Sequence, residues 1–294
     1  MAMNPQPEEK RAGPLYRRKD VLWLIAWVGG LIVLWIWDVI FLNPPALSRV
    51  ETAFLNSLFT GLLVVVFSLL LGWMTGVSLD LLERTGSLNL LGLLTMVLNV
   101  IRSIPQIILV LIGYIVLTLS FQGDLLRTSV QLLWVSGTIS LAVFLGIADT
   151  VRARLDYFRS LDFVDAMLCC GISEWRIINV EILWKNSRGH LIHKMIEIFG
   201  VSIFLQCSTD FIISVGLSTD VSLSNVPLTL GSLLASLDSK QDILALSSLW
   251  TNPAYVPAVL VNHLQGVTVA SCIVFTLLCI YNIANGFNRR YRLS

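Results

Sequence analysis

Six long apolar stretches dominate this sequence and restrict the folds open to it. They are residues 21–42, 54–79, 103–122 with a possible extension toward lower residue numbers, 128–148, 195–216 and 261–287. A helix needs about 20 residues to cross the hydrocarbon core of a bilayer, and each stretch is about that long. None alternates polar and apolar residues as a barrel strand does, so only an α-helix satisfies its backbone polar groups in lipid. The sequence therefore predicts an all-α integral membrane protein with about six transmembrane helices across residues 21–287.

The composition supports a membrane protein and excludes a water-soluble fold. Of the 294 residues, 55% are hydrophobic and only 13% are charged, against roughly 25% charged residues in a soluble domain. The expected environment is a lipid bilayer, and a net charge of +1 gives no indication of a nucleic-acid partner. Five cysteines lack the spacing of a zinc site or a disulfide framework, so we expect small apolar residues and no metal. They are Cys169, Cys170, Cys207, Cys272 and Cys279.

The basic residues predict which ends of the helices are cytoplasmic. Lys and Arg concentrate in residues 1–20, in the connection 149–194 and in residues 288–294. The other side of a six-helix arrangement holds only Arg49, Arg127 and Lys240. Cytoplasmic loops carry an excess of Lys and Arg, so both termini are predicted to be cytoplasmic. The first stretch exceeds a signal-peptide core in length, so we interpret it as a retained anchor.

Two connections are long enough to carry a function beyond turning the chain. The cytoplasmic connection 149–194 is basic but has regularly placed apolar residues, which predicts short amphipathic helices. The outer connection 217–257 is rich in Ser, Leu and Asp, and its stretch 228–237 is predicted to form a short helix against the outer mouth of the bundle.

A motif in the cytoplasmic connection carries the clearest functional signal. It begins with Asp165 and Ala166, continues to Gly171 and reaches Leu183 after the spacing of a known loop. This stretch resembles the EAA loop of the permease subunits of ATP-binding-cassette importers. That loop reads Glu-Ala-Ala, three residues, Gly, nine residues, then a hydrophobic position, any residue, Leu and Pro. The chain departs from it with Asp165 for Glu, Met167 for the second Ala, and Glu181 and Trp184 at the last hydrophobic and Pro positions.

The residues also predict the shape of this loop. Gly171 is suited to a left-handed helix cap, and Ser173 is suited to begin the next helix. We therefore expect a helix-turn-helix that presents Trp175 and Ile178 on one face. The resemblance implies that the loop couples the chain to a separate ATPase subunit. The residues implied in that contact are Asp165, Ala166, Gly171, Ser173, Trp175 and Arg176.

Two further segments strengthen the resemblance to importer permeases. Residues 98–109 resemble the Arg-Ser-Ile-Pro segment of methionine-type permeases, and Pro105 is predicted to kink the third span. Residues 281–290 resemble the end of dipeptide-type permeases. The resemblance implies a bacterial inner-membrane location, a second permease subunit that is the same chain or a different one, and an extracytoplasmic substrate-binding protein. It also implies that ATP and Mg²⁺ are used by the partner ATPase, with no cofactor bound by this chain.

Ionisable residues inside membrane spans are candidates for function because their insertion costs about 2.5–3.5 kcal/mol. Arg102, Glu197 and Asp210 meet this description. Arg102 is interpreted mainly as a residue of the cytoplasmic interface, and Glu197 as a partner of Lys194 or His193 or a residue of the pathway. Asp210 either lines the transport pathway or marks the end of its span, and both readings stay open.

Missing motifs limit what the chain does alone. It has no phosphate-binding loop and no Gly-Lys pair, and it has no HExxH or GxSxG motif. We therefore expect no enzymatic activity of its own. The leading hypothesis is the permease subunit of an ATP-driven importer for a small, peptide-like solute. The alternative is a secondary transporter driven by an ion gradient, which would use Asp210 and Glu197 as cation sites.

Overall fold

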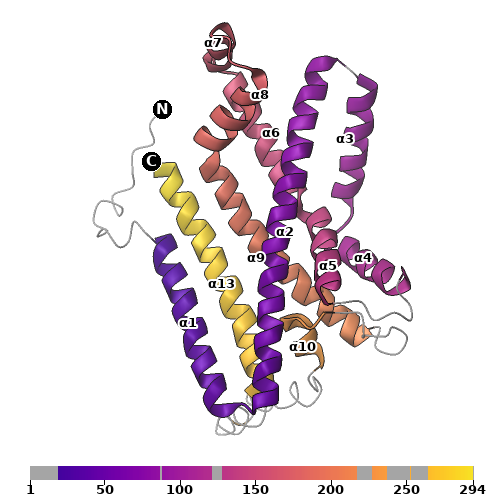
Figure 1. The fold of residues 1–294 in the computed structure, drawn as a ribbon, viewed down its shortest axis with the longest axis vertical. Helices are drawn as coiled ribbons and strands as arrows, with labels where there is room; N and C mark the ends of the chain where they lie inside the picture. Colours follow the sequence, from indigo (N-terminus) through magenta and orange to yellow (C-terminus); the bar gives the residue numbers. More distant parts are fainter. Residues whose placement is uncertain are drawn as a thin grey trace.

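The computed structural model describes residues 19–86, 88–120, 128–216, 227–236, 252 and 264–293. All regular structure in these ranges is helical (Figure 1). Four of the helices in this part of the chain are long and apolar enough to cross a membrane, or up to six spans result if each of two bent pairs is one span. This confirms an all-helical chain with several candidate spans. The helices are α1 (Lys19–Phe41), α2 (Pro44–Thr85), α3 (Leu88–Ser103), α4 (Gln106–Ser120), α5 (Thr128–Val143), α6 (Leu145–Arg159), α7 (Phe163–Cys169), α8 (Glu174–Arg176), η3 (Ile177–Asn186), α9 (Arg188–Gly216), α10 (Leu230–Ser236) and α13 (Leu264–Leu293).

The long helix α2 forms the central rod of the fold. Prolines occupy its first two positions, where a missing backbone N–H does no harm, and it ends at Gly86 in the left-handed conformation. Its 42 residues make a rod about 63 Å long, roughly twice the hydrocarbon core of a bilayer. The predicted span 54–79 lies inside this helix. Asp80 and Glu83 lie in the helical turns that follow this predicted span.

Helices α3 and α4 form the first bent pair, with an angle of 94° between them. The bend lies at Ile104 and Pro105, which confirms the predicted kink at this proline. The possible extension of this segment before Ser103 is present as helix, since α3 begins at Leu88 and runs back along α2.

The second bent pair, α5 and α6, is bent by 46° at Phe144. The fourth span was predicted to end at Ala148, but α6 continues to Arg159 without interruption. The short helices predicted in the connection 149–194 are present as α7, α8 and the π-helix η3. Glycines on α2 allow α6 to approach closely: a Cβ atom at Gly72 would lie 2.6 Å from the Cβ atom of Ile147.

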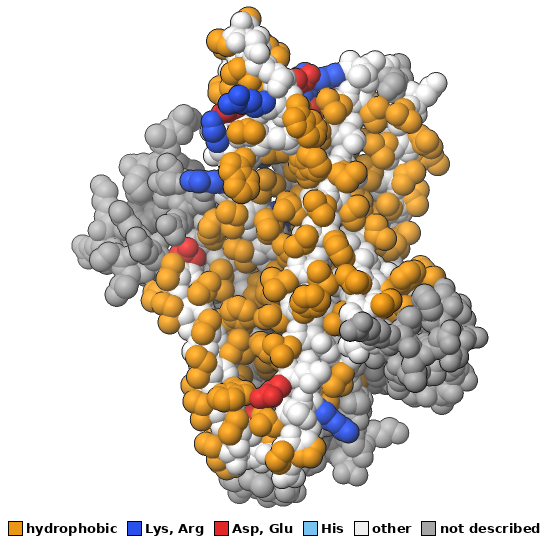
Figure 2. Space-filling view, viewed as in Figure 1, with side chains coloured by type: hydrophobic (Ala, Val, Ile, Leu, Met, Phe, Trp, Pro, Cys, Tyr) orange, Lys and Arg blue, Asp and Glu red, His pale blue; other side chains and the backbone are white. Residues whose placement is uncertain are grey.

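The first and last long helices lie side by side (Figure 1). A Cβ atom at Gly286 on α13 would lie 2.7 Å from the backbone nitrogen of Asp20, so the start of α1 and the end of α13 meet. Both ends lie toward the end of the molecule that carries α7 and α8 (Figure 1). Lysine and arginine side chains also gather at that end (Figure 2).

The short helix predicted in the outer connection is present as α10, which packs against α9. It lies deeper than predicted, since Leu230, Gly231 and Leu233 are buried. A Cβ atom at Gly231 would lie 2.6 Å from the Cα atom of Cys207 on α9. Of the outer connection 217–257, the structure describes only residues 227–236 and 252. Residues 1–18 of the predicted tail 1–20 also lie outside the described residues.

Candidate functional site

The predicted helix-turn-helix begins with α7 and turns at Gly171. This glycine has a φ of 76°, as the sequence predicted for a left-handed cap. The Gly171 amide donates to the Leu168 carbonyl at 2.9 Å, and the Ile172 amide donates to the Met167 carbonyl at 3.2 Å. This pair of hydrogen bonds is the Schellman arrangement, and Ile172 and Met167 both pack on the main apolar core as that arrangement favours. The turn is therefore fixed by backbone bonds and by an apolar contact beneath it.

Ser173 occupies the predicted N-cap position of α8, with an extended backbone at φ −63° and ψ 140°. Its hydroxyl makes no capping bond. Instead, its carbonyl accepts hydrogen bonds from the amides of Arg176 and Ile177, at 3.0 and 3.1 Å. The second helix therefore starts where the sequence predicted, but it starts without side-chain help.

The two faces of the helix-turn-helix differ sharply. All six candidate coupling residues are exposed: Asp165, Ala166, Gly171, Ser173, Trp175 and Arg176. Val164, Ile177 and Ile178 on the other face are buried in the main core. The predicted sharing of one face by Trp175 and Ile178 is wrong, because Trp175 is 58% exposed and Ile178 only 2%. The chain changes to a π-helix at Ile177, and this shifts the spacing of its faces.

Trp73 on α2 makes two contacts with the helix-turn-helix, one with the half-buried Asn179 and one with the exposed Trp175. The indole nitrogen of Trp73 on α2 donates to the Asn179 side-chain oxygen at 2.8 Å. The same Trp73 ring packs edge to face on Trp175, with 5.8 Å between ring centroids. Trp73 therefore contacts both α8 and η3 and packs the helix-turn-helix against α2.

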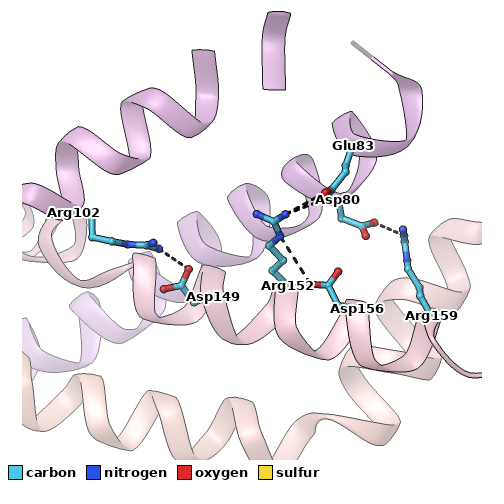
Figure 3. A network of polar contacts seen from close by, with 7 residues as sticks. All are labelled: Asp80, Glu83, Arg102, Asp149, Arg152, Asp156 and Arg159. Atoms are coloured by element: carbon cyan, nitrogen blue, oxygen red, sulfur yellow. Dashed lines mark hydrogen bonds and ion pairs between the residues drawn. The ribbon is translucent and has the colours of Figure 1, made fainter. Parts of the chain in front are cut away.

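An ionic network connects the same elements. Arg159, at the end of α6, pairs with Asp80 on α2 (Figure 3) and lies 3.6 Å from a Glu174 oxygen on α8. Glu174 also pairs with Arg84 on α2. Asp80 is 4% exposed and the Arg159 side chain 16%, so this pair is largely removed from water. Three helices therefore meet at one partly buried cluster of charges.

The other ion pairs of the network are more exposed to solvent, so each contributes less to the stability of the fold. Arg152 on α6 contacts Glu83 at 3.1 Å and Asp156 at 4.0 Å (Figure 3). Exposed pairs of this kind contribute about 0–1 kcal/mol each. The contact between Asp80 and Arg159 is not predictable from the sequence, because ionic residues separated by 79 positions carry no local signal of their contact.

Asp210 is fully buried between three elements. Its carboxylate accepts a hydrogen bond from the Tyr114 hydroxyl on α4 at 2.6 Å and another from the Thr229 hydroxyl just before α10. Nearby, the Leu230 amide donates to the Ser57 hydroxyl on α2 at 2.9 Å. The helix α9 continues beyond Asp210 to Gly216. It fastens α4 and the segment before α10 to α9.

Glu197 and Arg102 each have a partner of opposite charge. Glu197 pairs with Lys194 at 3.0 Å, which confirms one of the two partners proposed from the sequence. Arg102 pairs with Asp149 at 2.7 Å (Figure 3). Arg102 is the last residue but one of α3, about 21 Å along that helix from Leu88. The Arg102 side chain is 56% exposed, so this ion pair connects α3 to α6 at the surface of the bundle.

Two polar regions are thus candidates for function. One is the helix-turn-helix with the ion pairs that connect it to α2 and α6, and the other is Asp210 with its two hydroxyl donors. Among the residues that the structure describes, no three His, Cys, Asp or Glu side chains gather as a metal site would require. No protein-family model matches this chain, and no curated protein matches it.

Proposed function

We propose that this chain is the membrane-spanning permease subunit of an ATP-driven importer for a small, peptide-like solute. The observation that carries the proposal is the two-sided helix-turn-helix at Gly171. Its outer face exposes the six candidate coupling residues, and its inner face is fastened to α2 and α6. An element that served only to connect two spans would not need an exposed face that is held against two other helices.

The partner of the exposed face is an ATP-binding-cassette ATPase on the cytoplasmic side. That subunit uses ATP and Mg²⁺, and its closure moves the helix-turn-helix together with the spans beneath it. Two permease subunits, alike or different, enclose the pathway, and a substrate-binding protein delivers the solute from outside. The chain then lies in a bacterial inner membrane with both termini cytoplasmic. Such a cycle converts a local event at the ATPase into a two-state change of the bundle.

The contacts of the inner face give this movement a physical route. A displacement of α8 acts on α2 through Glu174 and Arg84 and through the contacts of Trp73. Arg159 adds a connection to α6 through its pairing with Asp80 and Glu174. Because α2 is one unbroken helix of 42 residues, a tilt at its cytoplasmic end reaches its outer end.

A second candidate function, transport driven by an ion gradient, is favoured by one observation. Asp210 is a carboxylate buried among hydroxyl groups within a span, a position suited to a proton or cation site. The two functions differ in their need for a partner. A secondary transporter moves its solute in liposomes without any ATPase, whereas a permease subunit does not.

Purification of the tagged chain from its own membrane in mild detergent tests the proposal. We expect an ATP-binding-cassette ATPase to co-purify and to be identified by mass spectrometry. Replacement of Ala166 by Arg puts a long charged side chain on the exposed face of α7 and should reduce the recovered ATPase at least about tenfold, since a mismatched charge in an interface costs several kcal/mol.

Asn89→Arg is the matched control, because Asn89 is exposed at the same end of the molecule but lies on α3, outside the helix-turn-helix. It should leave the recovery of ATPase unchanged. A stable oligomer of this chain that carries no ATPase, and that transports solute in liposomes, would contradict the proposal and support the ion-driven function.

A further inference from the structure

Residues 227–236, which include α10, pack against α9, α2 and α13 toward the end of the molecule opposite α7 and α8 (Figure 1). We call this stretch the plug segment. Its residues Thr229, Leu230 and Leu233 are 0–3% exposed, and α10 itself has only seven residues. A helix of that length is not stable by its own hydrogen bonds. The position of the plug segment therefore depends on its contacts with the surrounding helices.

Three polar side chains of α2 and α9 hold residues 228–230. The Asn56 amide on α2 donates to the first backbone carbonyl of this stretch at 2.8 Å, and the Ser57 hydroxyl accepts from its last backbone amide at 2.9 Å. The Asp210 carboxylate on α9 accepts from the Thr229 hydroxyl. Because all three bonds end on consecutive residues, a displacement of this short stretch breaks them together.

Two polar side chains without partners lie next to this set of bonds. Thr60 comes one helical turn after Asn56 on α2, and Gln206 comes one turn before Asp210 on α9. The two helices run in opposite directions (Figure 1), so both side chains lie one turn closer to the α7 end. Both are 0% exposed. Within the described residues, neither the Thr60 hydroxyl nor either amide atom of Gln206 has a hydrogen-bond partner.

These unpaired groups oppose the bonds that hold the plug segment. A buried amide or hydroxyl without a partner is rare, because burial removes its bonds to water. Water that reached Thr60 and Gln206 would restore those bonds. Thr209, beside Asp210, shows the usual arrangement, since its buried hydroxyl donates to the Leu205 carbonyl of its own helix at 2.7 Å. The three bonds therefore favour a seated plug segment, and the unpaired groups favour its displacement.

We propose that the plug segment is a gate, which closes the pathway on the side opposite the helix-turn-helix and opens it by leaving α2 and α9. On opening, Thr229 leaves Asp210, and water reaches Thr60 and Gln206. Interactions that favour each of two positions give an element that exchanges between them. The inference rests on the proposed import function, since it assigns the element that controls entry of the solute.

Cys207 on α9 is a native reporter of this movement. A Cβ atom at Gly231 would lie 2.6 Å from the Cα atom of Cys207, so the plug segment lies directly on this position. Cys207 is half-buried and packs on the apolar cluster that includes Leu230 and Leu233. Displacement of the plug segment therefore exposes the thiol to water.

The test is the rate at which Cys207 reacts with a negatively charged methanethiosulfonate reagent added to intact cells. The other four cysteines are replaced by alanine, and the remaining thiol is counted by mass tagging after denaturation. Thr229→Val removes the bond to Asp210 and should speed the reaction about tenfold, whereas Thr229→Ser keeps the hydroxyl and should leave the rate unchanged. Gln206→Leu and Thr60→Val each remove an unpaired group, favour the seated position and should slow the reaction about five- to tenfold.

Thr209→Val is the matched control, because its hydroxyl is buried on the same helix but already has a partner, and it should not change the rate. The opposite signs separate a gate from general damage, since a loosened fold would expose Cys207 more in every variant. Equal rates in Thr229→Val and the parent chain, or a faster reaction in both Gln206→Leu and Thr60→Val, would overturn the inference. A thiol that never reacts from outside the cell would do the same.

These outcomes are distinguishable from failure of the import function, because recovery of the ATPase depends on the exposed face of α7 and not on the plug segment. A chain that carries its ATPase but shows equal rates in all variants refutes only the present inference.

Discussion

Replacement of Arg159 by leucine is expected to lower the free energy of unfolding by about 3–5 kcal/mol. The substitution leaves the Asp80 carboxylate, only 4% exposed, without its main positive partner. Breaking one side of a buried ion pair has this effect because the remaining charge stays out of water without compensation. The measurement is denaturant-induced unfolding of the purified chain in detergent micelles, followed by tryptophan fluorescence.

The double variant with Asp80→Asn and Arg159→Leu should regain most of the lost stability, since no buried charge is left without a partner. Arg152→Leu is the matched control. It removes an arginine of the same helix whose partner Glu83 is half exposed, so its effect should stay within about 0.5 kcal/mol. Equal destabilisation by Arg152→Leu and Arg159→Leu would contradict a special role of the Asp80 pair.

Replacement of Asp210 by alanine is expected to lower the free energy of unfolding by about 2–3 kcal/mol. It deprives the buried Tyr114 hydroxyl of its acceptor and removes one acceptor from the Thr229 hydroxyl. A buried donor left without a partner costs about 1–3 kcal/mol, and the vacated volume adds to this. The same unfolding measurement in micelles determines the change.

A double-mutant cycle with Tyr114→Phe isolates the hydrogen bond. Tyr114→Phe alone should destabilise the chain by about 1–2 kcal/mol, but it should add little or nothing in the Asp210→Ala background. Asp162→Ala is the control, because Asp162 is exposed and makes no capping bond to α7. Additive effects of the Asp210 and Tyr114 substitutions would show that the two side chains do not depend on each other.

Features set by short stretches of sequence were predictable. Gly171 was expected to end a helix in the left-handed conformation, and it does so because only glycine takes that conformation at little cost. Pro105 was expected to bend its span, and the bend of 94° lies there. The short helix after residue 228 was also expected, and α10 is present. In each case one residue or a short apolar run determines the local backbone.

Features that depend on distant contacts were not predictable. The sequence left open how far the third span extends before Ser103, because the turn at Gly86 and the packing of α3 on α2 decide the course of this segment. The Arg159–Asp80 pair and the partners of Asp210 join residues far apart in the chain. A charge in an apolar run signals that a partner must exist, but only the packing of the helices identifies that partner.

The most direct test of the coupling element is the labelling of Cys169 and Cys170, both exposed at the turn of the helix-turn-helix. Cys207, Cys272 and Cys279 are first replaced by alanine so that only these two thiols are counted. A membrane-impermeant maleimide should label the chain in inside-out vesicles but not in intact cells. Labelling in intact cells would place the turn outside the cytoplasm, where no ATPase could contact it, and would contradict the proposed coupling.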